Sequence, residues 1–282
     1  MSIRHALLSL QTFPDAVPDR VLESACALAQ LLSAGLTVQL PQLDSDRSTW
    51  PPVMGAFPLD FPNLMQELVT KSEANASATA ESLARIAPNY GVNTDVRRLL
   101  TTAYAAPAPV TDLARLHDLT ILPVPEADGF GPSCVQAVLF GSGRPVVLLP
   151  SQRRRLQALE RITVAWDYSR EAARALADAL PLLKRAREVH VVTVLGEKHV
   201  KTHATRGDLE KFLTAHALRY SLHNVALDGD DIGPFLMDHA VAADANLLVM
   251  GAFGHSRLRE FVLGGATRAV LHDPLLPVFL SH

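Results

Sequence analysis

Apolar residues along this chain fall into two alternating patterns, short continuous runs and longer stretches in which they recur every three or four positions. The runs are typical of buried β-strands, and the periodic stretches are typical of helices with one buried face. In the first half, the runs predict strands at 5–10, 36–40, 93–99, 119–123 and 145–149. The periodic stretches predict helices at 19–32, 64–86 and 110–117, and the proline-rich segment 41–62 predicts a long surface excursion.

A charged segment, SQRRRLQALER at 151–161, interrupts the pattern and predicts a solvated linker. The same order of elements then begins again. Strands are predicted at 161–166, 189–195, 220–227, 247–250 and 278–280, and helices at 169–183, 205–218 and 232–243. Ser169 suits the N-cap of the first of these helices. This alternation of strands and helices predicts an α/β fold with a parallel sheet covered by helices on both faces.

The two halves end alike, with PVVLLP at 145–150 and PVFLSH at 277–282. We therefore predict an internal duplication of about 140 residues per copy, giving two tandem copies of an open five-stranded parallel α/β sandwich. The predicted domains are 1–150 and 157–282. Because the two final strands are short and apolar, they need a partner at the sheet edge. We expect the copies to pair through them as an internal pseudo-dimer, and pairing of whole chains stays open.

Composition and charge narrow the range of partners. The formal net charge of −3 gives no electrostatic reason to expect nucleic acid or an anionic membrane as a partner. No apolar stretch has the length of a transmembrane helix, and the N-terminal segment reads as a first strand rather than a signal peptide. Two cysteines, Cys26 and Cys134, make no disulfide framework. We therefore expect a cytoplasmic protein with two incidental thiols.

The segment NLLVMGAFGHSRLREFVLGGATRAVL, which follows the last helix, carries the best candidate chemistry. A strand leads into Gly251 and Gly254, and a second pair, Gly264 and Gly265, precedes Thr267. Glycines let a ligand approach the backbone, and a turn that opens a helix presents free N–H groups to an anion. This pattern predicts a phosphate site. The alternative is a tight turn followed by a close contact between helix and strand, which also requires glycine.

Asp167 follows the first strand of the second half, as Gly251 follows the fourth. Ligands of parallel α/β sheets bind beyond the carboxyl ends of the strands, so both residues fall at the expected edge. Asp167 is the only carboxylate that the sequence places near this edge. It could instead cap the helix that follows.

Asp167 together with Gly251-x2-Gly254-x9-Gly264 resembles the universal stress protein family, here as a tandem of two domains. The resemblance covers the second half well, and the first half only in strand order and final strand. It implies a Rossmann-like fold of the adenine nucleotide alpha-hydrolase type and a role in stress response. It also implies an adenine nucleotide as ligand, ATP or else AMP or ADP, with Mg²⁺ as a companion of the nucleotide rather than an ion held by a protein site.

The resemblance further implies a role for each matching residue. Asp167 would meet the adenine end, and Gly251 and Gly254 would lie against the ribose and phosphates. Further residues complete the predicted site: Val194, His255, Gly264, Gly265 and Thr267, of which the last three would hold the phosphate tail. Valine at Gly251 or Gly254 is expected to abolish nucleotide binding and to leave the protein folded.

Two departures from the family pattern qualify this picture. Gly265 stands where the family usually has a serine or threonine, so one hydrogen bond to phosphate is lost and weaker binding is expected. In the first half, Gln11 aligns with Asp167, and the glycines between 129 and 143 are scattered and read as loop residues. We expect one nucleotide per chain, bound in the second half, with the first copy as a structural or regulatory partner.

Other constellations are weaker. The acidic group Asp228, Asp230 and Asp231 lacks the spacing of a calcium loop, and His199 and His203 have no third ligand in view. The sequence predicts no catalytic residues and no metal site. Three functions therefore compete: a nucleotide-binding regulator, which we favour, a slow ATPase or phosphoryl-transfer enzyme, and an interaction scaffold without a ligand.

Overall fold

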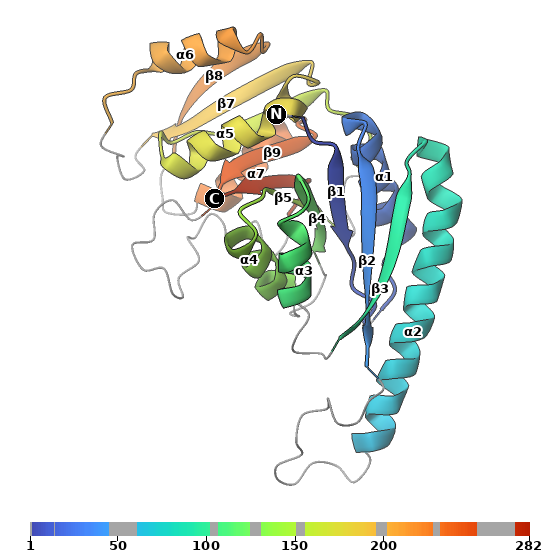
Figure 1. The fold of residues 1–282 in the computed structure, drawn as a ribbon. Helices are drawn as coiled ribbons and strands as arrows, with labels where there is room; N and C mark the ends of the chain where they lie inside the picture. The colour runs from blue at the N-terminus through green and yellow to red at the C-terminus, as the bar shows by residue number, and fades with distance from the viewer. Residues whose placement is uncertain are drawn as a thin grey trace.

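The computed structural model describes residues 2–13, 15–44, 61–101, 107–124, 131–150, 156–195, 202–227, 232–252 and 274–282. Within these residues the strands form one ten-stranded sheet in the order β3-β2-β1-β4-β5-β10-β9-β6-β7-β8. The ordering places five strands of the first half on one side and five strands of the second half on the other (Figure 1). The predicted α/β class with a mostly parallel sheet is confirmed.

The described part of the first half contains five strands, four α-helices and one short 3₁₀ helix. In chain order they are β1 (His5–Ser9), α1 (Asp19–Leu32), β2 (Gly35–Leu43), α2 (Phe61–Ile86), η2 (Ala87–Tyr90), β3 (Thr94–Thr101), α3 (Pro107–Ala114), β4 (Leu119–Val124), α4 (Gly131–Gly141) and β5 (Val146–Pro150).

The described part of the second half contains five strands and three helices. They are β6 (Arg161–Ala165), α5 (Arg170–Leu183), β7 (Glu188–Leu195), α6 (Arg206–Ala215), β8 (Tyr220–Ala226), α7 (Ile232–Ala242), β9 (Leu247–Gly251) and β10 (Val278–Ser281).

Strand pairing has the same register in both halves. Ala6 of β1 pairs with Leu119 of β4, and at the matching place Ile162 of β6 pairs with Leu247 of β9. All of these pairings are parallel. Among the described strands, the one antiparallel pairing joins β5 to β10, with Phe279 opposite Val147. The predicted contact between the final strands of the two halves is therefore confirmed, and it makes the two five-stranded sheets continuous.

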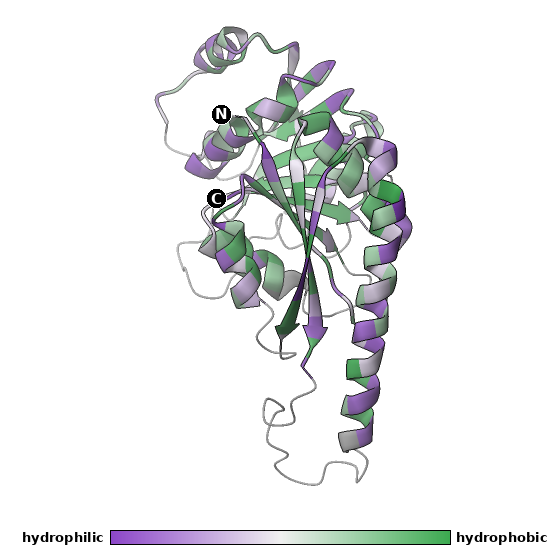
Figure 2. Ribbon diagram, turned by 45° about the vertical axis from the view of Figure 1, so that its right-hand side comes forward, coloured by the Kyte–Doolittle hydropathy of each residue, from purple (hydrophilic) through white to green (hydrophobic). Residues whose placement is uncertain are grey.

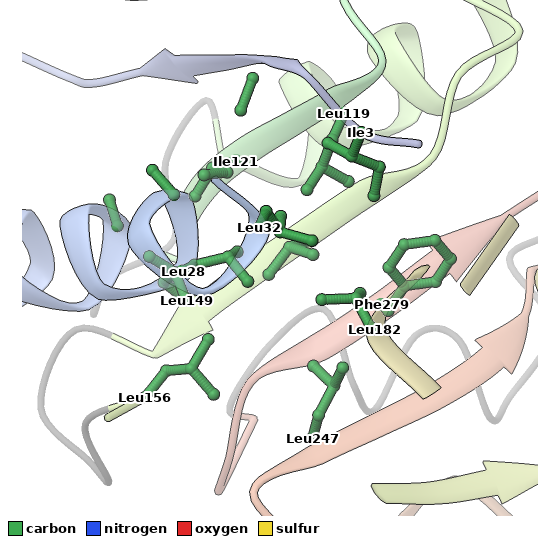
Figure 3. Close-up of a cluster of buried hydrophobic side chains, with 14 of the residues drawn as sticks. Ile3, Leu28, Leu32, Leu119, Ile121, Leu149, Leu156, Leu182, Leu247 and Phe279 are labelled. Atoms are coloured by element: carbon green, nitrogen blue, oxygen red, sulfur yellow. The ribbon is translucent and has the colours of Figure 1, made fainter. Parts of the chain in front are cut away.

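Two buried apolar layers, one on each face of the sheet, extend across both halves. Helices α1, α2, α5 and α6 supply one layer, and α3, α4 and α7 supply the other. At the junction the strand side chains alternate, so that Phe279 joins the first layer while its neighbours Val278 and Leu280 join the second. Figure 3 shows the first layer, with Phe279 beside Leu182 of α5.

The ends of several helices agree with the sequence. Ser169 is the N-cap of α5, and its hydroxyl accepts a hydrogen bond from the N–H of Ala172 at 3.0 Å. Helix α1 has the predicted bounds, but it is closed by Ser33 in the left-handed conformation (φ 55°), and Gly35 already belongs to β2.

Two local predictions were wrong. Strand β2 continues through Pro41 to Leu43, where a surface excursion was expected; residues 45–60 of that excursion lie outside the described part. Gly131 and Gly141 begin and end helix α4 rather than belonging to a loop. The helix forms because Val135, Val138 and Leu139 recur at helical spacing and are all buried. Gly141 is needed there, since a Cβ would lie 2.6 Å from Cγ2 of Thr111 on α3.

Helix α2 is the longest described helix and contacts β2 and α1 (Figure 1). It carries hydrophilic and hydrophobic residues along its whole length (Figure 2), as expected for a helix with one buried face. None of the helices in the described ranges has both the length and the apolarity that crossing a membrane requires.

Candidate functional site

The predicted site residues that the structure describes lie at one edge of the sheet. Strand β6 pairs in parallel with β9 on one side and with β7 on the other. Asp167 follows the carboxyl end of β6, Gly251 is the last residue of β9, and Val194 lies one residue before the end of β7. Because parallel strands end at the same edge, these three residues lie on neighbouring strand ends.

Asp167 is half-buried and its carboxylate is held by the backbone. Its Oδ1 accepts a hydrogen bond from the N–H of Ser169 at 2.8 Å, which closes a short turn between β6 and α5. The N-cap of α5 is Ser169 itself, so Asp167 does not occupy the capping position that was its alternative explanation. The turn fixes the orientation of the Asp167 side chain at the sheet edge.

Gly251 is required by packing. A Cβ on this residue would lie 2.5 Å from the carbonyl carbon of Glu171 and 2.6 Å from the backbone nitrogen of Ala172. The first turn of α5 thus rests directly on the end of β9. The close contact between helix and strand, given above as the alternative for these glycines, is present at Gly251. Gly251→Val should therefore disturb the packing of α5 as well as any ligand, because valine would displace the helix backbone.

Two aromatic residues that sequence reasoning missed flank Asp167. The rings of Trp166 and Tyr168 meet edge to face, with centroids 5.4 Å apart. Tyr168 has φ 63°, a conformation that a bulky residue adopts only when its surroundings enforce it. Nε1 of Trp166 is buried and has no hydrogen-bond partner among the described residues. The sequence signal was the pair of aromatics on either side of a loop aspartate.

A second carboxylate also lies near this edge. Glu171, in the first turn of α5, is 9% exposed, and its backbone is the part of the helix that meets Gly251. Its Oε1 accepts hydrogen bonds from Nε and Nη2 of Arg170, at 3.1 and 2.9 Å. Asp167 is therefore not the only carboxylate near the site, as the sequence had suggested.

The remaining predicted site residues lie outside the described ranges: Gly254, His255, Gly264, Gly265 and Thr267. The same holds for His199 and for the acidic group Asp228, Asp230 and Asp231. Among the residues that the structure does describe, no three His, Cys, Asp or Glu side chains are placed to hold a metal ion.

The corresponding edge of the first half is closed by a polar network. The hydroxyl of Ser72 on α2 accepts the N–H of Leu43, at the end of β2, at 3.1 Å. It also lies 2.9 Å from Oγ1 of Thr12, the residue after Gln11. Nδ2 of Asn75 donates to the carbonyl of Thr12 at 2.9 Å. Helix α2 therefore fastens the ends of β1 and β2 together at the place where the second half carries Asp167.

The two cysteines lie away from this edge. Cys26 is buried in α1 and Cys134 is half-buried in α4, and neither forms a disulfide. Burial raises the pKa of each thiol to about 11, so neither is a ready nucleophile.

Comparison with known proteins finds a family match in the second half of the chain and structural similarity across both halves. Residues 158–282 match the model of the Universal stress protein family. No curated protein sequence matches the chain. A universal stress protein from Archaeoglobus fulgidus DSM 4304 aligns with 98% of this chain and 95% of its own, at 18% identity and a TM-score of 0.70.

Two further solved structures are similar. A putative universal stress protein from Pseudomonas aeruginosa UCBPP-PA14 aligns with 99% of this chain and 93% of its own, at 15% identity and a TM-score of 0.59. A universal stress protein from Archaeoglobus fulgidus in complex with dAMP aligns with 52% of this chain and 98% of its own, at 15% identity and a TM-score of 0.33. The two alignments with TM-scores of 0.70 and 0.59 establish a shared fold across both halves.

Proposed function

We propose that this chain binds ATP, or a related adenine nucleotide, in its second half, where residues 158–282 match the model of the Universal stress protein family. We further propose that it acts in a stress response as a cytoplasmic regulator rather than as an enzyme. The observation that carries the proposal is the position of Asp167 and Gly251 on the ends of the neighbouring strands β6 and β9. The other glycines of the motif, Gly254, Gly264 and Gly265, follow Gly251 in the sequence.

In this proposal each residue has the role that the family resemblance implies. Asp167 receives the adenine end, with Val194 on the next strand beside it. Gly251 and Gly254 lie along the ribose and phosphates. The tail of the nucleotide is held by Gly264, Gly265 and Thr267, with His255 beside the glycine turn.

The described part of the edge fits such a ligand. The carboxylate of Asp167 is oriented by the Ser169 N–H, as recognition of an adenine amino group requires. Trp166, the residue before Asp167, has a buried Nε1 donor without a described partner. The aromatic pair of Trp166 and Tyr168 offers the kind of surface on which a base can stack.

A bound ATP would supply a transferable phosphoryl group, together with any Mg²⁺ that accompanies it. The chain's own residues bind and orient the nucleotide. Glu171, a buried carboxylate, is ion-paired with the adjacent Arg170 at 2.9 Å, so its charge is already engaged within the first turn of α5. This pairing favours the regulatory reading over the ATPase alternative.

We propose that residues 1–150 are a degenerate copy that supports the second domain. The antiparallel pairing of β5 with β10 and the polar closure at Ser72 both support this role. The proposal includes an internal pseudo-dimer of the two copies, and it leaves further pairing of whole chains to measurement.

Calorimetric titration of the purified full chain with ATP tests the proposal. We expect saturation near one nucleotide per chain and a roughly tenfold or greater loss of affinity in Asp167→Ala, which removes a charged hydrogen-bond acceptor. Gln11→Ala, the matching position in the first half, is the control and should bind as the unmodified chain does. Saturation near two, or unchanged affinity in Asp167→Ala, contradicts the assignment.

The three candidate functions separate in two further measurements. Mass spectrometry of the small molecules released on denaturing the purified protein should detect an adenine nucleotide if the site is used in the cell. Release of phosphate from ATP, compared between the unmodified chain and Asp167→Ala, distinguishes a regulator from an ATPase. Turnover that disappears in Asp167→Ala would overturn the regulatory part of the proposal.

A further inference from the structure

A pocket of about 560 Å³ opens at the amino ends of β6, β7 and β8, at the edge opposite to Asp167 and Gly251. Three segments line it: 158–160 before β6, 183–187 from the last residue of α5 to the start of β7, and 217–219 between α6 and β8. Strands rise about 3.3 Å per residue, so the length of β6 separates this pocket from the proposed nucleotide edge by roughly 20 Å. The two places are distinct.

The charges around this pocket are strongly biased. Lys184, Arg185, Arg187 and Arg219 line it, and Glu160 is the only acidic lining residue. The chain as a whole has a net charge of −3. Cations gathered in a concave site raise the local concentration of anions.

Arg185 contacts the end of helix α1. Its Nε donates to the carbonyl of Leu31, and its Nη2 lies 3.4 Å from the carbonyl of Leu32. These carbonyls end helix α1, where a cation complements the helix dipole. Arg185 therefore ties the second half to the first, and its charge is already engaged.

No comparable contact is made in the described part of the structure by Lys184, Arg187 or Arg219. All three are exposed, and none forms an ion pair or side-chain hydrogen bond with a described residue. The turns that bear them are closed by backbone bonds, from Ala186 N–H to the carbonyl of Leu182 at 3.2 Å and from Leu218 N–H to that of Leu213 at 3.1 Å. Those carbonyls do not need the three cationic side chains.

Beneath the cations the floor of the pocket contains three buried leucines. Leu159, Leu183 and Leu218 line the pocket and are each less than a tenth exposed. The volume lies in the range of small-molecule sites, which are typically apolar with a few convergent polar groups. Two guanidinium groups and one ammonium suit phosphate oxygens, since arginine can bind them with two parallel hydrogen bonds.

We propose that this pocket binds a small molecule that carries two or three linked phosphates. The inference is independent of the nucleotide site, because it uses none of that site's residues. It adds a second anion site to the same domain, at the junction with the first half.

Inorganic triphosphate is the probe, titrated calorimetrically into the full chain at low ionic strength. We expect saturable binding, and a loss of about tenfold for each arginine removed in Arg187→Gln/Arg219→Gln, with Lys184→Gln as an independent second variant. The matched control is Arg115→Gln/Arg206→Gln, which removes the same charge from two surface arginines paired with Asp112 and Glu210. The control should bind triphosphate as the unmodified chain does.

Hydrogen exchange locates the binding. Triphosphate should slow backbone exchange at 184–187 and 217–219 in the unmodified chain, and should not do so in Arg187→Gln/Arg219→Gln. An equal loss in the control pair would show a general charge effect and overturn the proposal. Protection confined to 251–267 would do the same, because it would place the phosphates at the opposite edge. Absence of saturable binding in the unmodified chain also refutes it.

Discussion

The two halves share a framework but differ in how their first helices meet the sheet. Helix α5 packs closely on β9 and β10, whereas α1 approaches mainly β2 and β5. The register explains the difference, since Pro123 of β4 occupies the position that Gly251 has in β9. A glycine lets the helix backbone rest on the strand, and a proline ring does not. One residue at a strand end thus decides how close the helix comes.

The two halves also differ at the edge where the carboxyl ends of their strands lie. In the first half, Ser72 of α2 fastens the end of β2 and the residue after β1 into one network. In the second half, Asp167 lies at the matching place with its carboxylate held in a turn. A duplicated framework can therefore keep its register while its two carboxyl edges carry different polar groups.

The largest expected effect concerns the contact between α5 and β9, which has no equivalent of similar extent in the described part of the first half. Gly251→Val should destabilise the protein by about 3 kcal/mol, because the new side chain overlaps the backbone of α5 and cannot be accommodated by a rotamer change. Pro123→Val is the matched control and should cost less than about 1 kcal/mol. Urea denaturation of both variants measures the difference. Equal stabilities would show that α5 can move away from β9 without cost.

A smaller effect is expected at the closed edge of the first half. Ser72→Ala leaves the N–H of Leu43 without its hydrogen-bond acceptor and should destabilise the protein by about 1–2 kcal/mol. ATP stoichiometry should stay at one per chain, since opening the network does not create an aspartate at Gln11. Ser77→Ala is the control for the denaturation series, since Ser77 is half-buried on the same helix and, among the described residues, its hydroxyl accepts only from the side chain of Arg98, at 3.3 Å. A second nucleotide bound by Ser72→Ala would show that the network alone had blocked the first copy.

The smallest expected effect is a pH dependence that belongs to the second half. His190, His223 and His239 lie in ring contact between β7, β8 and α7, with centroids 5.2 and 6.4 Å apart. Thr37 and Arg97 occupy the matching strand positions of the first half. Burial, and then the charges of His223 and His190, hold the pKa of His239 below its ordinary value of 6.5.

The sign follows from that depressed pKa. The unfolded chain takes up the proton more readily, so stability is full above pH 6.5 and declines as the pH falls below it. The facing groups are His190, His223 and Glu188, whose Oε1 lies 3.1 Å from Nε2 of His190. Thermal melting across this range should show a shallower decline in His239→Leu than in the exposed control His203→Leu. An unchanged slope would remove His239 as the cause.

The framework could be predicted from the sequence because its signals are local. Apolar runs and helical spacing gave the order of the elements, and Ser169 before an apolar period marked the start of α5. Helix α4 was missed because its terminal glycines resembled a loop, although Val135, Val138 and Leu139 carry the helical period.

The site was harder to predict because its determinants are tertiary. Nothing near Gly251 in the sequence shows that Glu171 and Ala172 will lie against it. The role of Ser72 likewise depends on contacts with Thr12 and Leu43, which are far away in the chain. Motif spacing pointed to Asp167 and Gly251, which do lie on neighbouring strand ends, but it could not identify the residues that pack against them.

The pairing of β5 with β10 also constrains the order of folding. Its partners Val147 and Phe279 are far apart in the chain, so the contact carries a large loop-closure entropy and should form late. Until then β5 is an apolar edge strand that another copy's β5 or β10 could pair with. Refolding at high protein concentration should therefore favour pairing of β5 in one chain with β10 in another, which exchanges halves between chains. Refolding at low protein concentration should favour the monomer in which β5 and β10 of the same chain pair.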